Sequence, residues 1–136
     1  MPIKVITNDD LLEISRMLRE YTDMLPDDEP NNSRMVIDLP EIGYITYNDV
    51  GAIAFITAKR LTDYYFIQNL YVRPGWRGLG LGTTLLSQIP TDMNCFLKVR
   101  IDHQISKEAI KFYEFNGFTR VRMLDEKRLL MSRAKK

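Results

Sequence analysis

The chain is poor in the residues that build covalent cross-links and metal centres, because its 136 residues include one cysteine and one histidine. Cys95 has no second cysteine with which to form an internal disulfide, and a structural zinc site needs a cluster of cysteine and histidine ligands that the sequence lacks. We therefore expect no bound metal. A chain without disulfides is typical of a reducing compartment, so a cytoplasmic location is expected.

Long apolar runs are also missing. No stretch approaches the roughly 18 apolar residues of a membrane-spanning helix, and the first residues, MPIKVITNDD, contain no apolar signal region. We expect neither membrane insertion nor secretion. Apolar residues make up 45% of the chain and charged residues 27%, which are ordinary globular values. The length fits one domain, so a single domain over residues 1–136 is predicted.

Charge is distributed unevenly along the chain, although the net charge is only +1. Residues 1–70 carry 12 acidic and 6 basic side chains, whereas residues 71–136 carry 6 acidic and 13 basic ones. The second half therefore suits an anionic ligand. The acidic first half argues against a nucleic-acid partner, which would need a broad basic face.

Hydrophobic periodicity predicts a mixed α/β domain. In the first half we expect a strand over residues 3–7, a helix capped by Asn8, a short helix over 33–38, and three antiparallel strands over 42–47, 50–58 and 64–72. In the second half we expect a helix over 81–89, a strand over 96–101, a helix over 107–115 capped by Ser106, and a strand pair over 118–124 and 127–132. Strands and helices do not alternate strictly, which disfavours a doubly wound sheet.

Residues 72–86, VRPGWRGLGLGTTLL, place four glycines between a predicted strand and a predicted helix. Such a loop favours an anion, because the first turn of a helix has unpaired N–H groups and glycine lets a phosphate approach the backbone. Arg73 and Arg77 add positive charge on the flanks. No lysine follows Gly82, so the segment is not a P-loop, and the glycine spacing does not match a dinucleotide-binding fingerprint. A glycine-rich turn without a ligand is the alternative.

The same segment resembles motif A of the GCN5-related N-acetyltransferase (GNAT) superfamily, Q/R-x-x-G-x-G/A, at Arg77, Gly80 and Gly82. Residues 109–118, AIKFYEFNGF, are similar to motif B of that family, A-x-x-x-Y-x-x-x-G-F. The order of predicted elements agrees with the family along essentially the whole chain. The resemblance implies a central, mostly antiparallel, twisted sheet that splays at an acetyl-CoA site and is flanked by about four helices.

The resemblance also implies acetyl-CoA as co-substrate. In the family the pyrophosphate lies on the backbone amides of motif A, and the pantetheine arm pairs with the edge of the preceding strand. The family often has asparagine at the start of the motif B helix, where this chain has serine. The expected acetyl-CoA contacts are Leu70, Tyr71, Val72, Arg77, Gly78, Leu79, Gly80, Leu81, Gly82, Thr83 and Ser106.

For catalysis the resemblance assigns Tyr113 as the general acid that protonates the departing CoA sulfur. A phenol carries its proton at neutral pH and can donate it. Many relatives carry a glutamate base in the strand before motif A, but the polar residues inside this strand, Gln68 and Asn69, cannot accept a proton. Asp102, His103 and a water relay to solvent are the remaining candidates for the base.

The resemblance implies an acetyltransferase that moves an acetyl group directly, in a ternary complex, to a primary amine: a protein lysine, an N-terminus, a polyamine or another small amine. Three acidic residues after the first helix, Asp27, Asp28 and Glu29, would attract a cationic amine. A homodimer would complete the acceptor pocket of so small a domain. The alternative is a non-catalytic acetyl-CoA-binding or regulatory module on the same fold.

Overall fold

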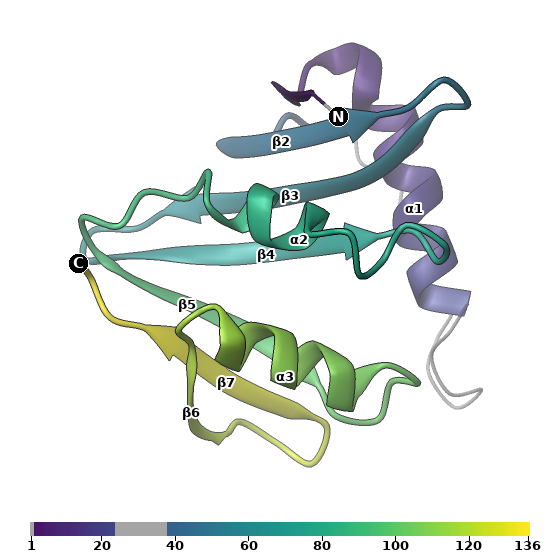
Figure 1. Ribbon diagram of the computed structural model, residues 1–136. Helices are drawn as coiled ribbons and strands as arrows, with labels where there is room; N and C mark the ends of the chain where they lie inside the picture. The colour runs from purple at the N-terminus through teal and green to yellow at the C-terminus, as the bar shows by residue number, and fades with distance from the viewer. Residues whose placement is uncertain (1, 24–37) are drawn as a thin grey trace.

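The protein folds around one seven-stranded sheet. The computed structural model describes residues 2–23 and 38–136 (Figure 1). The strands are β1 (Ile3–Val5), β2 (Ile42–Tyr47), β3 (Ala52–Arg60), β4 (Tyr64–Val72), β5 (Asn94–Arg100), β6 (Thr119–Met123) and β7 (Arg128–Arg133). Their order in the sheet is β1-β2-β3-β4-β5-β7-β6, and only β4 and β5 are parallel. The expected mixed, mostly antiparallel sheet is confirmed.

The helices cover both faces of the sheet. A 3₁₀ turn, η1 (Asn8–Asp10), leads into α1 (Leu11–Asp23), which packs on one face, while α2 (Leu81–Leu86) and α3 (Ser106–Phe115) pack on the other (Figure 1). The described part of the chain has three α-helices, one fewer than the family resemblance implied. The expected helix over residues 33–38 lies, apart from Asp38, outside the described residues. No helix in the described residues is long and apolar enough to span a membrane.

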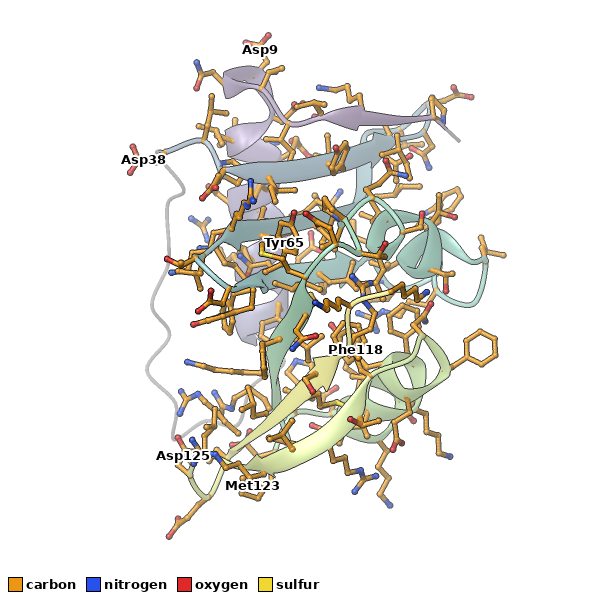
Figure 2. All side chains as sticks on the ribbon, turned by 90° about the vertical axis from the view of Figure 1, so that its left-hand side faces the viewer. Asp9, Asp38, Tyr65, Phe118, Met123 and Asp125 are labelled. Carbon is orange, nitrogen blue, oxygen red and sulfur yellow. The ribbon has the colours of Figure 1, made fainter. Side chains whose placement is uncertain are left out.

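Burial on both faces explains the composition of β3, whose residues from Ala52 to Ala58 are all buried. A strand covered on both sides reads as a continuous apolar run rather than an alternating one. Beneath α1 the core includes Met17 and Phe55. Under α2 and α3 it includes Leu85 and Phe118, and Phe118 lies between α3 and the sheet (Figure 2).

Strands β4 and β5 separate after a short paired stretch. Their register ends at the pair Phe66–Phe96, beyond which β4 pairs only with β3 and β5 only with β7 (Figure 1). On β4, the register with β3 shifts so that Gln68 is an extra residue between Ile67 and Asn69. Such a bulge bends a strand and breaks its pairing. The expected splay is therefore present, and it leaves backbone groups free on the facing edges of β4 and β5.

Several element boundaries differ from the sequence expectation. Helix α2 ends at Leu86 rather than at residue 89, because the next residues continue as a tighter turn in which the Ile89 N–H donates to the Leu86 carbonyl (3.1 Å). Thr7, not Asn8, holds the cap position before η1, and its N–H donates to Asp10 Oδ2 (2.8 Å). A side-chain hydrogen bond thus sets the start of η1, and a backbone turn sets the end of α2.

Candidate active site

A cavity of about 820 Å³ opens where β4 and β5 separate. Its walls come from residues 67–72 of β4, the loop before α2, residues 97–100 of β5 and the inner side of α3, with Leu18 and Tyr21 of α1. Every residue expected to contact acetyl-CoA lines this cavity except Leu79, which is 64% exposed. Tyr113 lines it as well. Its volume is in the range of small-molecule sites.

The loop before α2 presents unpaired N–H groups to this cavity. Gly78 and Gly80 have φ angles of +82° and +80°, a conformation that favours glycine, and a Cβ atom at either position would meet nothing within 4 Å. The first hydrogen bond within α2 runs from the Thr84 N–H to the Gly80 carbonyl (3.0 Å). The N–H groups of residues 81–83 therefore have no partner in the helix and can receive an anion.

Gly82 has a structural role in addition to the one its place in motif A predicts. Its backbone is helical, and a Cβ atom there would lie 2.9 Å from Cζ of Phe112 on α3. The absent side chain thus allows α2 and α3 to approach closely. This contact fixes the start of α2 against the helix that carries Tyr113.

Arg77 bends back over the end of β4 instead of extending into solvent. Its Nε donates to the Val72 carbonyl (2.8 Å), and the guanidinium lies 5.6 Å from the ring centre of Tyr71. Its Nη2 is buried and has no hydrogen-bond partner in the described residues. Arg73, in contrast, donates from Nη2 to Glu20 of α1 (2.8 Å) and from Nη1 to the Ala52 carbonyl (2.6 Å). Arg77 therefore lines the cavity and has one buried donor without a partner among the described residues, whereas Arg73 is bound to α1.

Tyr113 is held in an aromatic cluster on α3. Its ring packs edge-on against Phe112 (5.3 Å between centroids) and Phe118 (5.7 Å). Burial raises the pKa of the Tyr113 phenol above its ordinary value. The phenol is therefore protonated at neutral pH, as a proton donor at the cavity must be.

Asp102 is a weak candidate for the base. Arg100 donates to it twice, from Nε to Oδ1 (2.8 Å) and from Nη2 to Oδ2 (2.6 Å). The hydrogen bonds from Arg100 lower the pKa of the Asp102 carboxyl, although burial opposes them. Asp102 precedes His103 in the sequence, but its carboxylate is engaged in the ion pair with Arg100 and does not line the cavity.

His103 lines the cavity and is only 6% exposed. Its ring stacks on Tyr21 of α1, with centroids 4.4 Å apart and an angle of 8° between planes, and its Nδ1 accepts the Ile105 N–H (3.2 Å). Burial lowers the pKa of His103, while the nearby Tyr21 carbonyl opposes that shift more weakly. Nε2 is buried without a hydrogen bond to any described residue. His103 is thus neutral at neutral pH, and because Nδ1 accepts the Ile105 N–H, the ring proton lies on Nε2 and the one lone pair of the ring is already engaged.

Ser106 is buried at the start of α3, and its hydroxyl is already engaged. Oγ accepts the His103 N–H (2.9 Å) and lies within donating distance of the carbonyls of Arg100 (2.5 Å) and His103 (2.8 Å). The helix begins at Ser106 itself, and Ile105 occupies the cap position without a side-chain bond. Ser106 therefore closes the turn before α3. Its expected contact with acetyl-CoA stays a prediction.

Sequence reasoning missed the part of the site that lies on the α1 face. A second cavity of about 250 Å³ lies there and shares Leu18, Gln68 and Asn69 with the larger one. The consecutive polar residues Gln68 and Asn69 interrupt the apolar strand YYFIQNLYV, and this interruption was the available signal for a bulge. The acidic segment expected to attract the acceptor, residues 27–29, lies outside the described residues.

Comparisons with known proteins agree with this geometry. PaiA N-acetyltransferase from Thermoplasma acidophilum, solved with coenzyme A, has a TM-score of 0.76 at 20% identity, covering 98% of this chain and 99% of that one. The ribosomal-protein-S18-alanine N-acetyltransferase from Escherichia coli has a TM-score of 0.71 at 18% identity, covering 99% and 94%. Naa50 from Arabidopsis thaliana, solved with the bisubstrate analogue CoA-Ac-MVNAL, has a TM-score of 0.68 at 18% identity, covering 98% of this chain and 97% of that one. At these identities the likeness concerns the fold.

The family assignment comes from the sequence itself. No curated protein sequence matches the chain significantly. Residues 40–120, more than half of the chain, match the profile of the acetyltransferase (GNAT) domain, and this stretch contains β2 to β5, the glycine loop and Tyr113. The chain therefore belongs to the GNAT family of N-acetyltransferases.

Proposed function

We propose that this protein transfers the acetyl group of acetyl-CoA to a primary amine, directly and within one ternary complex. The observation that carries the proposal is the cavity at the splay, which joins unpaired backbone N–H groups at one end to the protonated Tyr113 phenol along its wall. The relatives solved with coenzyme A or a CoA-containing analogue support acetyl-CoA as the donor. A cytoplasmic location stays a prediction.

The described residues fit the parts of acetyl-CoA in turn. The N–H groups of residues 81–83 and the free Nη2 of Arg77 would hold the pyrophosphate. The open edge of residues 70–72 on β4 would pair with the amides of the pantetheine arm, because no strand occupies it there. The free space beside Gly78 and Gly80 leaves room for the phosphates.

The reaction forms a bond between the amine nitrogen and the acetyl carbon and breaks the bond between that carbon and sulfur. Tyr113, which lines the cavity, would give its proton to the departing sulfur. The amine must lose a proton, which Gln68 and Asn69 cannot accept. Asp102 is ion-paired with Arg100, and the lone pair of neutral His103 already accepts the Ile105 N–H, so a water relay to solvent is the route that fits that proton best. Holding both substrates together supplies much of the acceleration.

The test measures thiol release from acetyl-CoA while the concentrations of acetyl-CoA and amine are varied together, with wild type and Tyr113→Phe. Direct transfer predicts intersecting initial-velocity lines. Loss of a general acid predicts that Tyr113→Phe lowers kcat about 100-fold or more, with the Kd for acetyl-CoA unchanged. An unchanged kcat would remove Tyr113 from the chemistry.

The second candidate is a non-catalytic acetyl-CoA-binding module. The observation that favours it is the pair of amide side chains, Gln68 and Asn69, at the point on β4 where many relatives carry a carboxylate base. It predicts tight acetyl-CoA binding and no thiol release with lysine peptides, N-terminal peptides, polyamines or aminoglycosides. Turnover with any of these amines excludes it.

A further inference from the structure

Two cavities share lining residues at the bulge in β4. The larger one extends along the glycine loop and α3, and the smaller one lies under α1. Leu18, Gln68 and Asn69 line both. If the larger cavity takes acetyl-CoA, the second substrate reaches the acetyl group through the smaller one. The acceptor therefore has to fit the shape and polarity of the smaller cavity.

The bulge turns two consecutive amide side chains toward this junction. In a regular strand Gln68 and Asn69 would point to opposite faces, but the extra residue in the register lets both line the same space. Asn69 donates from Nδ2 to Thr57 Oγ1 (3.0 Å), which fixes its orientation and leaves Oδ1 as an acceptor. A neutral oxygen at this point suits the N–H groups of an amine.

The smaller cavity has an apolar side and a polar side. Ile14, Leu18, Leu39 and Pro40 form the apolar side, and Thr57, Gln68 and Asn69 form the polar side. Asp38 is the one carboxylate among the described lining residues, and its side chain is exposed and points away from the strands (Figure 2). The volume of about 250 Å³ is below that of most small-molecule sites and corresponds to about one large side chain.

We propose, on the basis of the proposed function, that the acceptor is a polypeptide with a free α-amino group and an apolar first residue. The α-amine sits at the Gln68–Asn69 junction, and the first side chain enters the smaller cavity. An α-amine and its side chain branch from the same carbon, so an α-amino acceptor needs an apolar pocket beside the reacting nitrogen. A lysine side chain is unbranched and leaves such a pocket empty.

Charge at the junction disfavours a polyamine. Lys98 on β5 and Gln68 on β4 each lie two residues beyond the last β4–β5 pair, and both line the larger cavity. The ammonium of Lys98 lies 5.6 Å from the ring centre of Phe66. A second ammonium on the acceptor would meet this cation near the junction.

The experiment compares acceptors with the full-length chain and acetyl-CoA. One series of lysine-free peptides differs only in the first residue: Met, Leu, Ala, Ser, Glu or Arg. A second peptide has a formylated N-terminus and one internal lysine, and spermidine is the third acceptor. We expect kcat/KM with Met or Leu to exceed that with Ala, Ser, Glu or Arg by at least about tenfold. The blocked peptide and spermidine should be poorer still.

A pair of leucine variants tests the pocket itself. Leu39 lines the smaller cavity and is 49% exposed, so Leu39→Trp should fill the cavity from its rim. Leu12 on α1 is 56% exposed and lines neither cavity, so Leu12→Trp is the matched control. Leu39→Trp should reverse the preference from Met to Ala while leaving the Kd for acetyl-CoA unchanged. Leu12→Trp should change neither. An unaltered preference in Leu39→Trp would overturn the assignment of this pocket.

The outcomes separate this inference from the proposed function. Faster acetylation of the internal lysine or of spermidine than of every free N-terminus would overturn the inference and leave the acetyltransferase assignment intact. Bound acetyl-CoA with no turnover of any acceptor would overturn both. Preference for a charged first residue would also overturn the inference, because the apolar side of the cavity could not favour it.

Discussion

Arg77 offers the sharpest quantitative test of the donor site. Replacing it with methionine keeps most of the aliphatic stem and removes the guanidinium, whose Nη2 has no partner and whose Nε is bonded to the Val72 carbonyl. A hydrogen bond to a charged group contributes about 1.5–3 kcal/mol. At about 1.4 kcal/mol per tenfold change, Arg77→Met should weaken acetyl-CoA binding by roughly 10- to 150-fold.

The same substitution should cost the fold less than it costs binding. The lost Nε bond is worth about 0.5–1.5 kcal/mol. The cation over the ring of Tyr71, 5.6 Å away, adds about 0.5–1 kcal/mol. We therefore expect the free energy of unfolding to fall by about 1–2.5 kcal/mol, measured by denaturant titration.

The assay is calorimetric titration with two ligands, acetyl-CoA and acetyl-pantetheine, which lacks the pyrophosphate. Arg77→Met should weaken only the first, because the guanidinium is assigned to the phosphates. Arg73→Met is the matched control: its guanidinium is bound to Glu20 of α1, so it should lower stability and leave acetyl-CoA affinity unchanged. An equal loss of affinity for both ligands, or an equal effect of Arg73→Met, would refute the reasoning.

Three further outcomes are expected. Burial acts to raise the pKa of Asp10, but hydrogen bonds from Lys4, the Thr7 N–H and Tyr47 outweigh it and lower that pKa. The stability that Asp10 contributes is therefore present above its ordinary pKa of about 3.9 and is lost as pH falls through the lower folded value. Asp10→Asn should lower the free energy of unfolding by about 1–2 kcal/mol at pH 7 and flatten the acid side of its pH profile, measured by denaturant titration. With a peptide acceptor, kcat/KM should rise with pH, with its midpoint at the amine pKa of about 7.7–8.0 and a plateau above it. A midpoint that does not move with the acceptor's own pKa would show a protein base instead. Burial raises the pKa of Cys95 to about 11, so iodoacetamide should label it only on unfolding, and rapid labelling of the native protein would contradict its buried position.

The parts of the site that the sequence predicted are those encoded locally. Gly78 and Gly80 need a backbone conformation that glycine supplies, and Tyr113 occupies a fixed position on a single helix. The glycine loop and Tyr113 could therefore be predicted from the sequence, because each motif depends on residues that lie close together in the chain.

Contacts between distant residues could not be predicted in the same way. Arg73 and Arg77 read alike in the sequence, but Glu20, more than fifty residues earlier, binds Arg73 and leaves only Arg77 at the cavity. His103 was a loop histidine by its sequence context. Its neutral, buried state comes from stacking on Tyr21 of α1. Packing between elements decides the ionisation and availability of such groups.

The acceptor side shows the same division. The sequence shows Gln68 and Asn69 as a polar pair in an apolar strand, and from residue type alone it follows only that these amides cannot act as a base. The register shift against β3 gives them another place in the structure, since both line the two cavities at the bulge. That shift depends on pairing with a separate strand, which single-strand patterns do not encode.

The central claim is that this chain moves an acetyl group from acetyl-CoA to an amine. The most direct measurement incubates the protein with acetyl-CoA labelled in the acetyl group and a panel of peptide amines, then follows thiol release and label on the amine by mass spectrometry. We predict one labelled amine for each thiol released. Thiol release without labelled amine would show hydrolysis, and acetyl-CoA binding without thiol release would show a binding module; either result would contradict the account.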